Sequence, residues 1–451
     1  MKKKILYTLI GLAVLLLLIY MLRYNQSQIF KNRVPQSATK VVNVNLRQIE
    51  NDLLFDFLAH PIIYLKSRRR KKDSIKKNKF PFINGIEIPK NVLFFSNATT
   101  FDRHWFSSVF KVKDKEKLTH YFLQEKFVKS SKNGVEFYSK GILVLAINGE
   151  KLLHVIKRSS QADISKIVAV VFNETTFLSQ ESILLKPIIT NESDISFSSK
   201  EGGFLEANFK EGLFEVTGNL ASDFFINNTS PEIVGGPISF FTAKINKDNL
   251  QFKEFVKKGT VKFDEITHLS LDSIVNKWNG KVSLNLASIE HTIDTIVTYE
   301  FDDDFNKVKK IATQEKVIPA LNLKFGNEEQ SDLSEYFWRK NAIQVHDGDT
   351  LFTAVPVYKF IAVNTKDNLE LSVAKKQINK GSKKTISKLN FYFDIEKYLQ
   401  KPLDFPLNKE QIKALSLIKT TSINWSNENQ FSLKIALKDV DRNFLGQLIK
   451  H

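Results

Sequence analysis

Two basic stretches hold the residues of this 451-residue chain that could most readily bind a ligand. Residues 66–79 contain nine Lys or Arg and one Asp, and residues 375–388 contain six Lys and no acid. Such runs attract anionic lipid head groups, lipopolysaccharide or an acidic protein, although solvated loops of a lysine-rich chain would look the same. The candidate contact residues are Arg68, Arg69, Arg70, Lys71, Lys72, Lys76, Lys77, Lys375, Lys376, Lys383 and Lys384.

Residues suited to catalysis or metal binding are scattered. The cluster 346–350 (HDGDT) could offer oxygen ligands to a cation, but it lacks the further acids and closing Glu of a calcium loop, and a turn between two strands explains it equally well. The eight histidines form no HExxH or HxH pair. Ser-x-x-Lys spacings occur without the supporting motifs of a Ser/Lys nucleophile, and GxSxG, P-loop and GxGxxG sequences are absent. We therefore expect no catalytic residue, cofactor or metal.

Composition bounds the class of protein. The chain has no cysteine, which excludes thiol catalysis, iron–sulfur clusters and cysteine zinc sites. The net charge of +17 resides in three N-terminal lysines and the two basic runs, so the remaining surface is near neutral and nucleic acid is not an expected partner. Hydrophobic residues at 42% and charged residues at 25% are typical of globular domains, and 37 Phe favour β-rich cores.

The N-terminus predicts where the protein works. Three lysines, residues 2–4, precede an uncharged apolar run, residues 5–22, that spans roughly 27 Å as a helix. The run is longer than a secretory signal core, and no cleavage site follows it. We expect an uncleaved transmembrane signal anchor with a cytoplasmic tip at residues 1–4 and the bulk of the chain in the periplasm, held at the inner membrane. A cleaved signal peptide and a cytoplasmic-facing domain are the alternatives.

A strand followed by a short helix recurs along the chain. Residues 39–46 alternate as a strand, and apolar residues at helical spacing follow until His60, where Pro61 should end or kink the helix. Tyr336-Phe337-Trp338 could form an exposed aromatic platform or pack into a core. The pattern predicts an α+β fold with antiparallel sheets and short packing helices. Similar units lie at 106–122, 238–255, 389–399 and 431–448, with strand-rich stretches at 135–156, 204–220, 281–301 and 350–373 and a helix at 407–418.

The domain organisation follows from loop signals. Residues 23–33 form a short polar stalk, and the loop NNTSPEIVGGP at 227–237 is the strongest break in the middle of the chain. We expect a first α+β lobe at 34–230 and a second at 231–451. Whether the two lobes are true repeats is open, because the shared strand–helix pattern is loose.

Several stretches resemble a known group of proteins. VPQSA at 34–38 leads into a strand and NLRQIENDLL, and the chain closes with LNFYFDIEKYL, IKALSLIKTTSINW, FSLKIALKD and NFLGQLI. These segments resemble the starts and ends of uncharacterised membrane-anchored envelope proteins of Gram-negative bacteria. The resemblance implies a location in the cell envelope and no catalytic residues.

Together these observations predict a non-enzymatic, single-pass envelope protein whose extracytoplasmic domain binds or scaffolds another envelope component. The alternative is a lipid or lipoprotein carrier, which an apolar cavity above roughly 300 Å³ would favour. The third possibility is an unrecognised enzyme, which a cleft with clustered, strongly shifted carboxylates would favour.

Overall fold

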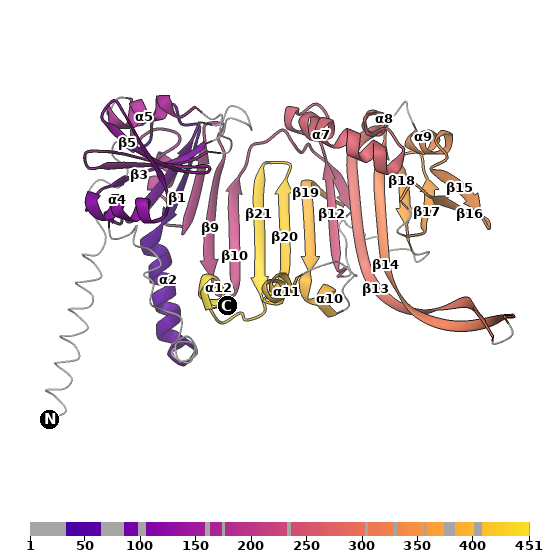
Figure 1. The fold of residues 1–451 in the computed structure, drawn as a ribbon. Coiled ribbons are helices and arrows are strands. Elements are labelled where there is room, and N and C mark those ends of the chain that lie inside the picture. Colours follow the sequence, from indigo (N-terminus) through magenta and orange to yellow (C-terminus); the bar gives the residue numbers. More distant parts are fainter. Residues whose placement is uncertain are drawn as a thin grey trace. The chain divides into compact units, whose positions relative to one another are not determined.

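The chain folds into two compact units in the computed structural model (Figure 1). Unit 1 comprises Met1–Leu220 and Asp441–His451, and unit 2 comprises Ala221–Val440. The C-terminal segment, predicted as part of a second lobe, therefore belongs with the first unit. The structure describes residues 33–64, 85–97, 105–157, 163–173, 176–231, 236–302, 305–328, 332–355, 358–373, 384–400 and 408–450.

Unit 1 is built on an antiparallel sheet with the strand order β4-β5-β6-β7-β3-β2-β1-β8-β9-β10. Its strands are β1 Lys40–Asn45, β2 Asn91–Ser96, β3 Trp105–Lys111, β4 Val128–Lys132, β5 Val135–Lys140, β6 Leu143–Asn148, β7 Lys151–Lys157, β8 Ile195–Ser199, β9 Phe204–Lys210 and β10 Leu213–Asn219. Its helices are α2 Leu46–Ala59, α4 Lys115–Gln124, α5 Ser165–Phe172, α6 Lys186–Ile189 and α12 Phe444–Lys450.

Two apolar clusters form the core of unit 1. One gathers Phe95, Trp105 and Ile167, with the two aromatic rings edge to face at 6.2 Å between centroids. The other places Phe122 of α4 against Tyr138 of β5. Neither cluster includes a residue of α2, so this helix is joined to the unit by other contacts.

Unit 2 has an antiparallel sheet with the order β21-β20-β19-β12-β13-β14-β18-β17-β16-β15, and β11 pairs with the start of β19. Its strands are β11 Thr229–Pro231, β12 Ser239–Lys244, β13 Trp278–Phe301, β14 Lys307–Asn327, β15 Ile343–His346, β16 Asp349–Phe352, β17 Phe360–Asn364, β18 Asn368–Ser372, β19 Lys384–Asp394, β20 Ile418–Ser426 and β21 Gln430–Leu437. Its helices are α7 Leu250–Thr267, α8 Leu271–Lys277, α9 Leu333–Arg339, α10 Ile395–Gln400 and α11 Lys409–Leu415.

The α+β class with large antiparallel sheets and short helices is confirmed. Residues 281–301 lie in one long strand, β13, and not in a pair. Asp347 and Gly348 form the two-residue turn between β15 and β16 with φ of 51° and 80°, so the turn interpretation of this cluster is correct. Asn408 and Gln411 make the reciprocal capping box that begins α11.

The predicted anchor, residues 5–22, lies outside the described residues, and so does the stalk apart from Arg33. Within the described ranges, none of the helices combines the length and the apolar character needed to cross a bilayer.

Candidate functional site

The basic residues chosen from the sequence fall almost entirely outside the described parts of the chain. Lys384 is the exception: it begins β19, where it pairs across the strands with Pro231. The basic-run prediction therefore stays a prediction. The residues outside the described ranges are Arg68, Arg69, Arg70, Lys71, Lys72, Lys76, Lys77, Lys375, Lys376 and Lys383.

The end of α2 presents an apolar surface that the sequence did not lead us to expect. The helix begins where the Asn45 side chain accepts a hydrogen bond from the Gln48 amide, and it ends at His60 before a further helical turn, residues 61–64. The predicted helix is confirmed, but its apolar side is not buried, and Asp56 is its one buried residue. We call the exposed apolar residues the α2 tip: Leu54 (41% exposed), Phe55 (69%), Phe57 (38%), Leu58 (63%) and Ile62 (64%).

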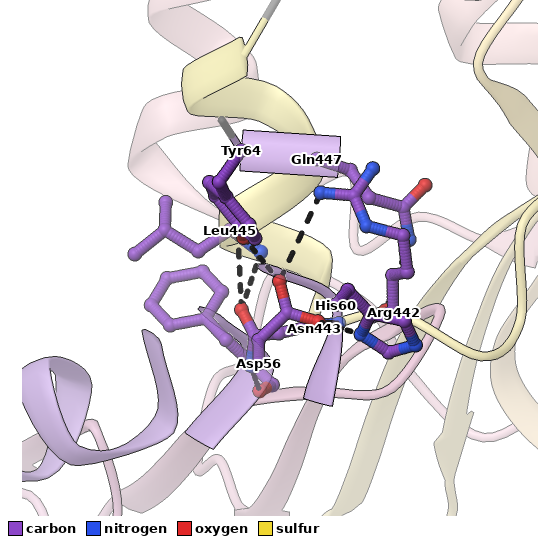
Figure 2. Close-up of polar contacts among 9 residues, drawn as sticks. Asp56, His60, Tyr64, Arg442, Asn443, Leu445 and Gln447 are labelled. Atoms are coloured by element: carbon purple, nitrogen blue, oxygen red, sulfur yellow. Dashed lines mark hydrogen bonds and ion pairs between the residues drawn. The ribbon is translucent and has the colours of Figure 1, made fainter. Parts of the chain in front are cut away.

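Asp56 lies at the centre of a polar network behind the α2 tip (Figure 2). Its Oδ1 accepts the Asn443 backbone N–H at 3.0 Å and lies 3.2 Å from His60 Nδ1. Its Oδ2 accepts the Tyr64 hydroxyl and lies 3.8 Å from Arg442 Nη2. Because Asp56 and Arg442 are both more than nine-tenths buried, each charge compensates the other where water cannot.

The partners of Asp56 come from the C-terminal segment. The Asn443 side chain accepts the Leu445 and Gly446 amides at 2.9 and 3.1 Å, which caps α12, and donates to the Phe209 carbonyl of β9 at 2.6 Å. The Phe444 ring stacks on Phe209 with 6.2 Å between centroids. The Asp56 network therefore joins α2, α12 and β9, although Asp56 and Asn443 are 387 positions apart.

Tyr64 closes the network over the buried cation. The Arg442 guanidinium carbon lies 5.4 Å from the centre of the Tyr64 ring, within the range of a cation–π contact. Burial, followed by the hydrogen bond to Asp56, raises the pKa of Tyr64 above its usual value of 10.0. The hydroxyl therefore stays protonated and keeps donating to Asp56 at neutral pH.

A pocket of about 560 Å³ lies beside the Asp56 network. Two carboxyl groups face each other in it: Asp52 from α2 and Asp194, which directly precedes β8. Burial is the main cause that raises the pKa of Asp194 to about 6; the Phe209 amide hydrogen bond opposes this, and the neighbouring Asp52 carboxyl adds to it. Burial also raises the pKa of Asp52. The lining residues are Gln48, Asp52, Phe55, Asp56, Ala59, His60, Asp194, Asn208, Phe209, Lys210, Glu211 and Asn443.

The carboxyl pair has a structural explanation. Asp194 is 2% exposed, and its Oδ2 accepts the Phe209 amide at 2.6 Å, so it fixes β9 beside α2. Its Oδ1 has no hydrogen-bond partner among the described residues, and a proton shared with Asp52 would satisfy it. The described residues contain no group of three or more His, Cys, Asp or Glu side chains that could hold a metal.

Sequence reasoning missed this site. The signal available was Asp56, an acid inside the apolar stretch 53–59 of this helix, with a second acid, Asp52, four positions before it. Their partners could not be named, because they lie on β8, β9 and the C-terminal segment. The aromatic platform is not formed either: Tyr336 and Phe337 are 8% and 5% exposed, and Trp338 is exposed by itself.

Comparison with solved structures gives a distant similarity to TP0453. No protein-family model and no curated protein sequence matches the chain. The crystal form IV structure of TP0453 is 12% identical over 41% of this chain and 80% of that one, with a TM-score of 0.27. Forms I and III are 8% identical over 75% of this chain and 91% and 92% of theirs, with TM-scores of 0.23. These scores are too low to support an argument about function.

Proposed function

We propose that the protein is a non-enzymatic, single-pass envelope protein whose extracytoplasmic part binds another envelope component through the α2 tip. The single observation that carries this proposal is the exposed apolar end of α2, held against the sheet by the buried Asp56 network. Exposing five large apolar side chains in one place is unfavourable for a monomer, and such patches mark interaction sites.

The sequence around the α2 tip supports the same function. Residues 66–79, with nine basic residues, begin one residue after the helical turn 61–64. An apolar helix face next to a basic run suits a partner that offers both apolar and anionic groups. The predicted anchor at residues 5–22 would keep this surface near the inner membrane, in the periplasm.

Photo-crosslinking in native membranes tests the contact. A photoreactive phenylalanine analogue replaces Phe55 or Leu58 in the full chain, and Ile183, which is 61% exposed in the same unit but outside the α2 tip, serves as the matched control. We expect adducts from both α2 positions and not from position 183. Equal labelling from all three positions would contradict a specific surface.

Vesicle binding tests the contribution of the basic run. The ectodomain without residues 1–33 should bind anionic vesicles weakly at low salt, because each basic residue contributes up to about 1 kcal/mol near an anionic surface and salt screens it beyond roughly 8–10 Å. Replacing Arg68, Arg69, Arg70, Lys71 and Lys72 with Ser should remove most of the binding without lowering thermal stability. Undiminished vesicle binding by this variant would show that the basic residues 68–72 do not contribute to membrane binding.

The pocket also bears on the two alternative functions, a lipid or lipoprotein carrier and an enzyme. Nine of its twelve lining residues have polar or charged side chains, although most of the exposed lining surface is apolar, so the pocket does not decide on the carrier alternative, which requires an apolar cavity. The Asp52–Asp194 pair does favour an enzyme, because two carboxyls with raised pKa values can divide the roles of acid and base. This second candidate function predicts turnover in a panel of chromogenic esters, glycosides and phosphoesters, with a bell-shaped pH profile that Asp52→Asn abolishes. No turnover by the parent at any pH between 4 and 8 would leave the pair with its structural role.

A further inference from the structure

The outer half of the β13–β14 hairpin extends beyond the rest of its sheet (Figure 1). Strand β12 pairs only with residues 281–286 of β13, and β18 only with residues 322–326 of β14. From Ile289 and Pro319 outward, the two strands pair with each other and, among the described residues, with no third strand. We call residues 289–319 the β13–β14 ribbon. Ile289 and Val317 at its base pack against the sheet's apolar residues, but the part beyond them has no packed face, and such a two-stranded ribbon is marginally stable in water.

One face of the ribbon carries most of its exposed apolar side chains, mainly along β13, together with the Thr295–Thr313 pair. Directly opposed residues in an antiparallel pair share a face, and alternate residues along a strand do too. Val297 lies opposite Ile311. The exposed residues on this face are Ile293 (77% exposed), Val297 (43%), Tyr299 (55%), Phe301 (66%) and Ile311 (65%).

The opposite face carries a charged pair and a hydroxyl, together with Val308, which lies opposite Glu300 and is 48% exposed. Glu300 and Lys310 form an ion pair there at 2.6 Å, and the Thr298 hydroxyl donates to the Lys310 carbonyl at 3.3 Å. The ribbon is therefore amphipathic, with one face suited to water and the other to a partner.

Charges at the two ends of the apolar face are opposite in sign. Glu315 lies at the base, beside Ile293 and 2.9 Å from His291 Nδ1. Lys307 and Lys309 lie near the tip, opposite Phe301 and Tyr299. The Val297–Ile311 pair stands midway, so the face has an acidic end and a basic end at equal distances from its centre.

This arrangement is complementary to itself. Two ribbons can stack with these faces together around a two-fold axis. The axis passes between the Val297–Ile311 pairs of the two copies and runs perpendicular to the strands. Each strand then lies antiparallel over the same strand of the other copy. Ile293 then meets Phe301 of the other copy, and Glu315 meets Lys307. We infer that the β13–β14 ribbon is a self-association surface, and that its partner is a second copy of this chain bound face to face. This contact is separate from the α2 tip and goes beyond the proposed function.

A lipid surface fits the ribbon less well. The sequence that follows β13 is Asp302-Asp303-Asp304, and three acids would be repelled by anionic head groups.

The contact area predicts a weak dimer. From Ile293 to Phe301 the face is about 27 Å long at about 3.4 Å per residue, and two strands are about 10 Å wide. Each copy therefore covers a few hundred Å², below the roughly 1,000 Å² total of a stable interface. Anchoring in one membrane would raise the local concentration and favour the contact.

Cysteine crosslinking tests the geometry, because the chain has no cysteine of its own. In Val297→Cys the two thiols of a face-to-face dimer lie opposite each other at the axis. In Thr298→Cys, the matched control one residue along, they point away. With a short bis-maleimide and the full-length chain in membranes, we expect a crosslinked dimer from Val297→Cys and about tenfold less from Thr298→Cys.

Charge reversal is the second part of the crosslinking test. Added to Val297→Cys, Lys307→Glu or Glu315→Lys alone should reduce the dimer about tenfold, since like charges then face each other. The double reversal should restore it. Equal crosslinking at positions 297 and 298, no dimer from Val297→Cys, no restoration by the double reversal, or a crosslink to a different protein would each overturn the inference.

Discussion

The α2 tip and the β13–β14 ribbon both expose apolar side chains, but different contacts support them. The α2 tip is held in place by the Asp56 network, whose residues come from α2 and from the C-terminal segment of the chain. The ribbon is maintained by cross-strand pairing between neighbours in sequence. A surface built the first way is coupled to the stability of its unit, whereas one built the second way can be altered without unfolding the unit.

Asp56→Ala should show the largest effect on this coupling. The change removes the acceptor of the Asn443 amide and leaves Arg442 buried without its counter-charge, which costs about 3–5 kcal/mol in unfolding free energy. Urea unfolding of the ectodomain measures it, with Asp272→Ala, an exposed carboxylate in the first turn of α8, as the control. A loss below about 1 kcal/mol would mean that the network does not secure α2.

Asp194→Asn should change the pH dependence of unit 1. With a pKa of about 6 in the folded state against the ordinary value of 3.8, the native protein holds an extra proton between these pH values, so Asp194 favours folding below pH 4 and this contribution is lost as the pH rises through 6. Asparagine keeps an acceptor for the Phe209 amide without ionising. We expect the variant to be more stable than the parent above pH 6, by up to about 3 kcal/mol.

Glu136 is the control for the pH dependence of stability, because its pKa is shifted in the opposite direction to that of Asp194. Lys115 and then Tyr138 hold the pKa of Glu136 down to about 2. Glu136 therefore stabilises the fold above its unfolded pKa, and this contribution is lost as the pH falls toward 2. Glu136→Gln should lower stability at neutral pH. If both variants changed stability in the same direction at pH 7, the assigned protonation states would be wrong.

Two Gly→Ala substitutions compare a helix packed tightly against the Asp56 network, α12, with a helix that has free space beside its glycine, α7. A Cβ on Gly446 of α12 would lie 2.5 Å from Tyr64 Oη and 2.6 Å from Asp56 Oδ2, so Gly446→Ala should cost about 1–3 kcal/mol. A Cβ on Gly259 of α7 would approach nothing closer than 3.9 Å, so Gly259→Ala should stabilise unit 2 by about 0.5–1 kcal/mol. Thermal unfolding measures both, and a neutral Gly446→Ala would show that α2 and α12 separate easily.

The smallest effect is expected at the ribbon. Ile311→Ser should leave unfolding free energy within about 0.5 kcal/mol of the parent, because the side chain is 65% exposed. Leu286→Ser, a 7%-exposed residue of the same hairpin at its packed base, should cost about 2–5 kcal/mol. A large loss from Ile311→Ser in dilute, monomeric protein would show that the apolar face packs within the chain.

Local signals predicted much of the secondary structure. Asp114, which follows β3 within the predicted unit 106–122, caps α4 by accepting the Lys117 amide. Gly141 and Gly149 adopt positive φ in the turns of the β5–β6–β7 meander. These features depend on residues within a few positions of each other, so the sequence carries their full physical cause.

Other properties depended on distant contacts. Apolar spacing predicted the helix 46–59, but whether its apolar side would be buried depended on which elements reached it, and α12 and β9 reach the Asp56 side instead. The alternating pattern of residues 281–301 predicted a strand without showing that its outer half would lack a third neighbour.

The sequence by itself determined the charge distribution, the α+β class and the helix caps, and it predicts the anchor, which lies outside the described residues. The tertiary structure alone decided that Asp52 meets Asp194, that Asp56 meets Arg442 and that Ile311 stays exposed. The physical reason is that burial and charge pairing are set by residues brought together over hundreds of positions, and neither periodicity nor composition specifies those partners.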